Sequence, residues 1–239
     1  MTCARREGLS RVRFGSRDDV SAVLAGRRVA LVGSGPGVLE NPRGLIASYD
    51  VVMRVNNYKL APATGARTDV FFSFFGESIR KTARELKRDG VKLCMCKCPD
   101  SKPIESKWHA DRNKPRGVDF RYIYQGRADW WFCDTYVPTE AEFLEHFDLL
   151  GGHVPTTGFS ALLTLLSFEP LSVYMTGFDF FSSGLHNVNE RWKPGDPRDP
   201  IGHGPKGEAK WLADNMARFP ITADRRLLET LKRTKREAA

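Results

Sequence analysis

The stretch VALVGSGPGVLENP, residues 29–42, is an apolar run that breaks into three glycines within five residues. Such a run is typical of a buried strand followed by a tight turn and a helix, and the backbone N–H groups of the turn can bind a phosphate. Gly33 and Gly35 are therefore candidates for a phosphate or nucleotide site. A turn that serves only the fold is the alternative, and the stretch alone does not decide between the two.

The rest of the chain repeats the pattern of apolar runs separated by helical segments. Most runs are continuous rather than alternating and rich in Val and Phe, as in strands that are covered on both faces. Strands are predicted at 27–34, 50–56, 69–75, 91–96, 119–124 and 171–178, and helices at 77–90, 138–150, 157–168, 206–219 and 223–236. This order predicts an α/β protein with a single Rossmann-like, doubly wound and mostly parallel sheet.

The composition fits one domain. The chain has 239 residues, 41% of them hydrophobic, which suffices for one sizeable core. We expect a basic extension at 1–26, a catalytic core at 27–220 and a basic C-terminal helix at 221–239. The formal charge of +8 should attract anions, so the partner could be nucleic acid, an acidic membrane surface or a negatively charged small substrate.

No membrane span is expected from the sequence. No stretch approaches the roughly 20 apolar residues that a span needs, and the N-terminal arginines are not followed by an apolar block. We therefore expect a cytoplasmic protein. The basic termini leave open a peripheral contact with the inner face of the membrane.

Five cysteines occur, and three of them alternate in the sequence CMCKC at 94–98. Alternating residues of a strand share one face, so these thiols should point the same way. A zinc site usually takes two pairs of ligands, each pair separated by two or more residues, and this chain lacks that spacing. We expect reduced, partly buried thiols and no metal site.

The glycine turn does not match the dinucleotide fingerprint. Val38 stands where the third glycine of GxGxxG is needed, and the strand at 50–56 ends in asparagine rather than in an acidic residue that could bind a ribose. The glycine turn is not a P-loop either, because it is not followed by a lysine and a Ser or Thr. An NAD-dependent oxidoreductase is therefore disfavoured.

A second cluster of glycine and hydroxyl residues lies in VPTTGFSALLTLLSFEPLSVYMTGFDFF, residues 154–181. Thr156, Thr157 and Gly158 begin a helix whose free N–H groups could bind an anion or a ribose. Gly177 follows the next strand and would let a flat base lie against the backbone. The alternative is that Thr156 only caps the helix. Two such sites in one sheet favour a nucleotide.

Two histidines follow this cluster in a segment rich in Pro, Gly and Asp. Histidine exchanges protons near neutral pH, and a carboxylate often sets its charge and tautomer. His186 and His203 are therefore candidate catalytic residues, and Glu208 follows His203 by five positions. The other histidines, His109, His146 and His153, are expected at the surface.

These segments together resemble glycosyltransferase family 29, the eukaryotic-type sialyltransferases. Residues 27–72 resemble the large sialylmotif, with VMRVN at 52–56 and GARTD at 65–69, and residues 154–181 resemble the small sialylmotif. LHN at 185–187 stands where the third motif has histidine, and HGPKGE at 203–208 is similar to the His-x4-Glu of the very small motif. The four motifs occur in the family's order over about half of the chain.

The resemblance implies the GT-A-like variant of the fold and inverting transfer of a sialic acid, or of a related acid sugar such as Kdo, from its CMP-activated form to a glycan or glycolipid acceptor. It implies His203 as the general base, His186 as a hydrogen-bond donor to the departing phosphate, and Glu208 as the residue that orients the helix or the base. The residues that would bind the CMP-sugar are Gly33, Ser34, Gly35, Asn56, Thr156, Thr157, Gly158, Gly177 and Phe178. No cofactor and no metal are expected, and nucleic acid is not the expected partner.

The chain departs from the family in several places. Ser34 replaces an asparagine, and Val29 and Glu169 stand near the positions of the cysteine pair that joins the large and small motifs. With no membrane anchor expected, these departures fit a soluble, bacterial-type member. The segment 97–137 would select the acceptor, with Trp108, Trp130 and Trp131 as candidate sugar-stacking residues. The competing hypothesis is a non-catalytic module that binds a nucleotide or nucleic acid.

Overall fold

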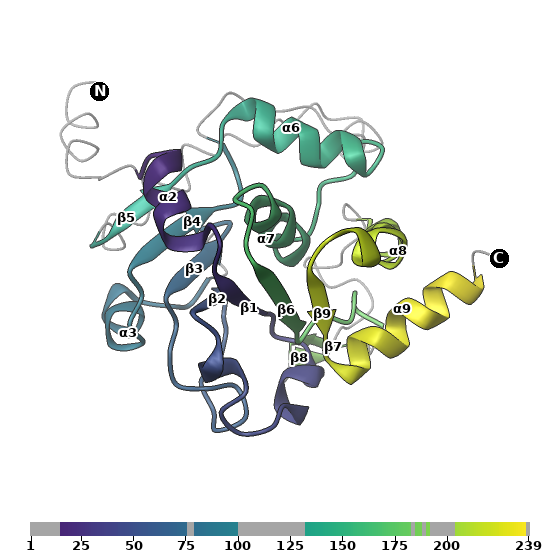
Figure 1. Ribbon diagram of the computed structural model, residues 1–239, viewed down its shortest axis with the longest axis horizontal. Coiled ribbons are helices and arrows are strands. Elements are labelled where there is room, and N and C mark those ends of the chain that lie inside the picture. Colours follow the sequence, from purple (N-terminus) through teal and green to yellow (C-terminus); the bar gives the residue numbers. More distant parts are fainter. Residues whose placement is uncertain are drawn as a thin grey trace.

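Seven parallel strands form one sheet at the centre of the structure (Figure 1). The computed structural model describes residues 15–75, 79–99, 132–182 and 204–237, together with the backbone of 185–187 and 190–191. The strands are β1 (Arg28–Val32), β2 (Val51–Val55), β3 (Val70–Ser73), β4 (Leu93–Cys96), β5 (Asp134–Tyr136), β6 (Ser172–Thr176) and β9 (Ile221–Ala223). Their order in the sheet is β5-β4-β3-β2-β1-β6-β9.

The sheet order confirms the doubly wound fold. The chain runs from β1 to β5 towards one edge and then returns to place β6 on the other side of β1. The strand order therefore reverses between β1 and β6, and ligands of such sheets bind at the carboxyl ends of the strands at this switch point. Both β1 and β6 were predicted from the sequence, whereas the short strands β5 and β9 were not. The strand expected at 119–124 lies outside the described residues.

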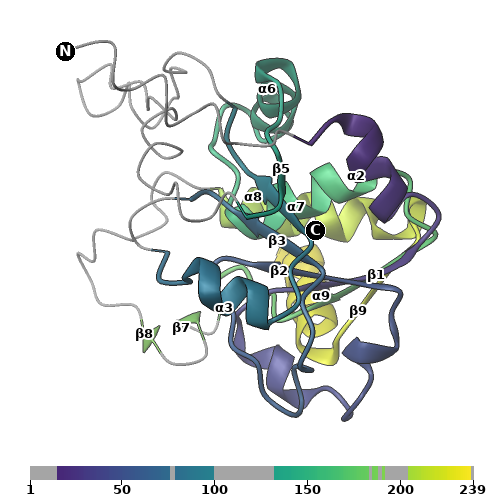
Figure 2. The ribbon, with the colours of Figure 1, turned by 90° about the vertical axis from the view of Figure 1, so that its left-hand side faces the viewer.

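Helices cover both faces of the sheet (Figure 2). The α-helices are α2 (Arg17–Leu24), α3 (Ala83–Arg88), α6 (Glu140–Leu149), α7 (Thr157–Leu166), α8 (Pro205–Asn215) and α9 (Arg225–Glu237). The described residues also form the short 3-10 helices η1 (Pro36–Glu40), η2 (Ile46–Ser48) and η5 (Met216–Arg218). A separate antiparallel pair is formed by β7 (Leu185–Asn187) and β8 (Glu190–Arg191).

Alternation along the strands divides the core into two layers. Val29 and Leu31 of β1 belong to the larger apolar cluster, which also contains residues of α2, α7 and α8. Ala30 and Val32 face the opposite way and pack with residues of η1 and η2. Cys94, Cys96 and Cys98 all lie in the cluster on the α3 side, so the expectation that they share a face is confirmed.

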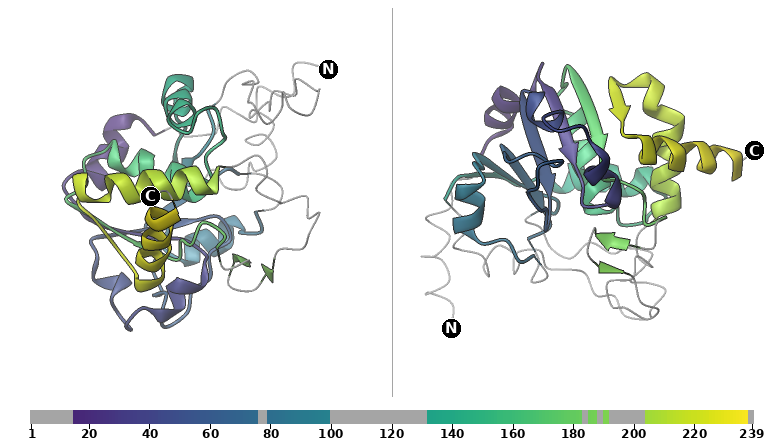
Figure 3. Two further views of the ribbon diagram at one scale, coloured as in Figure 1. Left: turned by 90° about the vertical axis from the view of Figure 1, so that its right-hand side faces the viewer. Right: turned by 90° about the horizontal axis from the view of Figure 1, so that it is seen from below.

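The packed unit extends beyond the core expected at 27–220. In α2, Val20 and Leu24 are fully buried against the sheet, so the segment before residue 27 contributes to the core. At the other end, β9 joins the sheet, and α9 buries Leu227 and Leu231. Figure 3 shows α9 beside α8 at this end of the sheet.

Local sequence explains where the helices begin. α3 begins after Thr82 rather than near residue 77 as predicted, because Thr82 and Glu85 form a reciprocal capping box. Thr139 and Glu142 do the same for α6. Within the described ranges, no helix is long and apolar enough to cross a membrane.

Candidate active site

The glycine turn after β1 lies against the end of β6. The N–H of Gly33 donates to the carbonyl of Thr176 at 2.8 Å, and the N–H of Gly35 donates to the carbonyl of Gly177 at 2.8 Å. A Cβ at Gly33 would lie 2.3 Å from the Gly177 carbonyl oxygen, so only glycine permits this approach. Both glycine N–H groups are thus used within the fold, and the turn brings β1 and β6 together at the switch point.

An aspartate that sequence reasoning missed holds the end of β6. Asp224 accepts hydrogen bonds from the Thr176 hydroxyl at 2.7 Å and from the N–H of Gly177 at 2.9 Å. Its other carboxylate oxygen accepts from the N–H of Leu227 at 2.8 Å, which caps α9. The sequence did carry a signal for it, because an aspartate directly before a helical segment is a typical N-cap, and Asp224 precedes RRLL at 225–228. Asp224 therefore couples the switch point to α9.

Phe178 lies where the two glycine clusters meet. A Cβ at Gly158, in the first turn of α7, would lie 2.4 Å from Cε1 of the Phe178 ring, and a Cβ at Gly33 would lie 3.1 Å from the same atom. The structure thus brings together residues from the β1 turn, the end of β6 and the start of α7, which lie far apart in the sequence. Phe178 itself is half-buried.

Thr156 caps α7 and is held by Glu208 of α8. Its hydroxyl accepts a hydrogen bond from the N–H of Phe159 at 3.2 Å, so the capping interpretation is confirmed. The Thr156 N–H and hydroxyl also donate to the two carboxylate oxygens of Glu208 at 2.6 and 2.7 Å. Glu208 is fully buried, and burial raises the pKa of its carboxyl group to about 7. The start of α7 and the start of α8 are therefore joined.

Lys97 is a buried cation near this carboxylate and was not predicted as a site residue. It follows β4, is 7% exposed, and its backbone N–H donates to the carbonyl of Ser73 at 2.8 Å. Burial lowers the pKa of its ammonium group, while the negative charge of Glu208 opposes that change. A single lysine after an apolar strand gave no sequence signal that it lies near Glu208.

Asn56 lies at the carboxyl end of β2 in the left-handed region, with a φ of 49°. Its side-chain oxygen accepts a hydrogen bond from the Ser73 hydroxyl at 3.2 Å. Among the described residues nothing accepts a hydrogen bond from its side-chain NH2 group. Ser34 is half-buried in the turn after β1 and has no hydrogen-bond partner in the described ranges.

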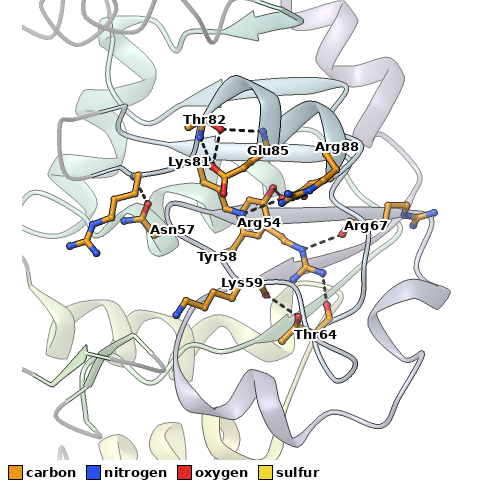
Figure 4. Close-up of polar contacts among 12 residues, drawn as sticks. Arg54, Asn57, Tyr58, Lys59, Thr64, Arg67, Lys81, Thr82, Glu85 and Arg88 are labelled. Atoms are coloured by element: carbon orange, nitrogen blue, oxygen red, sulfur yellow. Dashed lines mark hydrogen bonds and ion pairs between the residues drawn. The ribbon is translucent and has the colours of Figure 1, made fainter.

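Arg54 of the VMRVN segment points towards the loop between β2 and β3 (Figure 4). The side chain is fully buried, donates to the carbonyls of Thr64 and Arg67, and lies 5.6 Å from the centre of the Tyr58 ring. Tyr58 in turn donates to Asp89 at 2.8 Å. This arginine therefore fixes the loop after β2, and burial lowers its pKa to about 10.

Of the two candidate catalytic histidines, the structure describes only the backbone of His186. The backbone of His186 lies in β7, whereas its side chain and the whole of His203 lie outside the described residues. The segment with Trp108, Trp130 and Trp131 also lies outside them. Over the described ranges, no group of three His, Cys, Asp or Glu side chains is placed to hold a metal ion.

The architecture is that of the sialyltransferases. No protein-family model and no curated protein sequence matches the chain. Among solved structures, a mammalian sialyltransferase in complex with Gal-beta-1-3GalNAc-ortho-nitrophenol matches with a TM-score of 0.55 at 19% identity, over 92% of this chain and 78% of that chain. The sialyltransferase CstII from Campylobacter jejuni, in complex with the substrate analogue CMP-3FNeuAc, matches with a TM-score of 0.52 at 16% identity, over 82% and 81%. The alpha-2,3-sialyltransferase Cst-I from the same organism matches with a TM-score of 0.53 at 16% identity, over 88% and 77%. At these identities the likeness establishes a shared fold.

Proposed function

We propose that this chain is an inverting glycosyltransferase that moves a sialic acid, or a related acid sugar such as Kdo, from its CMP-activated form to a hydroxyl of a glycan. The observation that carries the proposal is the meeting of the β1 turn, the end of β6 and the start of α7 at the switch point. The order of the four motifs supports it, and so does the shared fold with a sialyltransferase solved with a CMP-sugar analogue.

The described residues suit a CMP-sugar at this edge. The N–H groups of the first turn of α7, at Thr157 and Gly158, would donate to the phosphate, since a helix N-terminus favours an anion. The side-chain NH2 group of Asn56 and the hydroxyl of Ser34 have no partner within the described ranges, so they could bind the ribose or phosphate. The half-buried Phe178 would contact the cytosine ring.

The proposed reaction is a single displacement. The acceptor oxygen forms a bond to the anomeric carbon while the bond from that carbon to the phosphate oxygen breaks, and CMP leaves. The proton of the acceptor hydroxyl passes to the imidazole of His203, and His186 donates a hydrogen bond to the departing phosphate. One displacement inverts the anomeric configuration.

Glu208 would position the base rather than react. Its carboxylate binds Thr156 and so fixes the first turn of α8, and His203 directly precedes Gly204 and α8 in the chain. The positive and N–H groups of the site can stabilise a monophosphate leaving group, so we propose that no metal takes part.

Binding of CMP tests the proposal without knowledge of the acceptor. Thermal shifts should rise with CMP concentration, because a ligand that binds only the folded state stabilises it. UMP, AMP and NAD should stabilise less. The variant His203→Ala should keep the CMP shift and lose release of CMP from the CMP-sugar, whereas turnover in this variant would show that the base is misassigned.

The salt dependence of binding separates this function from nucleic-acid binding. A nucleic-acid complex should weaken steeply as salt rises, since counterions are released from the phosphates. Binding of CMP should change little. A chain that binds oligonucleotides but shows no response to CMP would contradict the proposal.

A further inference from the structure

Lys97 is a buried cation at the carboxyl edge of the sheet. The side chain is 7% exposed, and no described residue accepts a hydrogen bond from its Nζ. A buried cation is costly unless it is paired and hydrogen-bonded. The described part of the chain supplies no such hydrogen bond to Lys97.

The direction of the side chain follows from the alternation of β4. Leu93 and Met95 face the cluster that contains α7 and α8, while Cys94 and Cys96 face α3. The hydrogen bond from the Lys97 N–H to Ser73 continues the ladder by one residue. Lys97 therefore points to the same side as Leu93 and Met95, towards the start of α7.

Glu208 compensates the charge of Lys97 without satisfying its hydrogen bonds. The two groups interact electrostatically. Both carboxylate oxygens of Glu208, however, accept hydrogen bonds from Thr156. No hydrogen bond or ion pair joins Lys97 to Glu208 among the described residues, so within them the N–H groups of the ammonium remain available to an anionic oxygen of a ligand.

We propose that Lys97 binds the carboxylate of the acid sugar in the CMP-activated substrate. The inference rests on the proposed function and names the residue that recognises the sugar as an acid. β4 lies three strands from β1 in the sheet, a distance of about 14 Å at roughly 4.8 Å per strand. The nucleotide would occupy the switch point at β1 and β6, so Lys97 lies towards the sugar end of the same molecule.

The test compares ligands that carry or lack the carboxylate. CMP-3-fluoro-sialic acid is used as a slowly reacting substrate analogue, and CMP is used as the nucleotide alone. For Lys97→Met, the dissociation constant of the analogue should rise about tenfold or more, because a buried charge-assisted hydrogen bond is lost. The dissociation constant of CMP should stay within about twofold, and Lys97→Arg should restore part of the affinity for the analogue.

Two further variants control for folding and for charge. Lys92→Met removes a lysine that is 78% exposed just before β4, at the opposite end of the strand, and should change neither constant. The double variant Lys97→Met with Glu208→Gln removes both buried charges, so that neither is left uncompensated. It should bind CMP and still show the loss for the analogue.

The outcomes distinguish this inference from the proposed function. Equal binding of the analogue by wild type and Lys97→Met would overturn it. An equal loss for CMP and the analogue would also overturn it, because the lysine would then act on the phosphate or on the fold. A wild-type protein that binds neither ligand would instead refute the proposed function on which the inference rests.

Discussion

The stability of the Glu208→Gln variant relative to wild type should increase as the pH rises. Glu208 is fully buried, and its pKa in the folded protein is raised from an ordinary 4.5 to about 7 by burial. The folded state therefore binds a proton more tightly than the unfolded state. The resulting stabilisation is fully present below pH 4.5 and is lost as the pH rises through about 7.

The size of this effect follows from the interval between the two pKa values. One pKa unit is worth about 1.36 kcal/mol, so the interval from 4.5 to about 7 is worth about 3 kcal/mol. Glutamine is nearly isosteric with the protonated carboxyl group. Its oxygen can accept from the Thr156 N–H, and its NH2 group can donate to the Thr156 hydroxyl. The variant should therefore fold and should lack this titration.

Urea unfolding of both proteins between pH 4.5 and pH 8 measures the difference directly. The free energy of unfolding of Glu208→Gln minus that of wild type should increase by about 3 kcal/mol over this range, since groups common to both proteins cancel. Glu229→Gln, which removes a carboxyl group that is 61% exposed on α9 instead of a buried one, is the matched control. A flat or falling difference for Glu208→Gln would refute the reasoning.

Three further predictions concern other parts of the protein. Gly33→Ala should lower the free energy of unfolding by about 3 kcal/mol or more in urea titrations, because its Cβ would lie 2.3 Å from the Gly177 carbonyl oxygen. Gly207→Ala, inside α8, where a Cβ would meet Leu150 Cδ2 at an ordinary contact distance of 4.0 Å, should stabilise the protein, and equal effects of the two changes would contradict this. Iodoacetamide followed by peptide mass spectrometry should show Cys133 alkylated before Cys94. Cys133 is half-buried with its pKa lowered by the adjacent thiol, whereas Cys94 is buried with its pKa raised, so faster labelling of Cys94 would be inconsistent. EDTA should leave the transfer rate within about twofold, because the N–H groups at the start of α7 and the imidazole of His186 can stabilise a monophosphate leaving group. A loss of rate that Mg²⁺ restores would show a metal requirement.

The sheet could be predicted where long apolar runs dominate. β1, β2, β3, β4 and β6 have four or five residues each and are almost entirely buried, so their composition identifies them. β5 and β9 have three residues each, include polar side chains and lie at the edges of the sheet, where local sequence carries little signal. Their pairing depends on long-range packing.

The site was predictable in its parts but not in its connections. The glycine clusters were found, but their N–H groups at Gly33 and Gly35 bind carbonyls of the neighbouring segment instead of remaining free. A turn motif cannot show which backbone approaches it. The contact between Thr156 and Glu208 spans 52 residues, and the proximity of Lys97 likewise depends on the fold.

Anomeric NMR of the reaction with a CMP-sialic acid tests the central claim most directly. The sugar is β-linked to the phosphate in this substrate, so a single displacement by a glycan hydroxyl, or by water in its absence, must first give the α product. We predict that the α signal appears first, with one CMP released for each sugar transferred. Initial formation of the β product would contradict the mechanism.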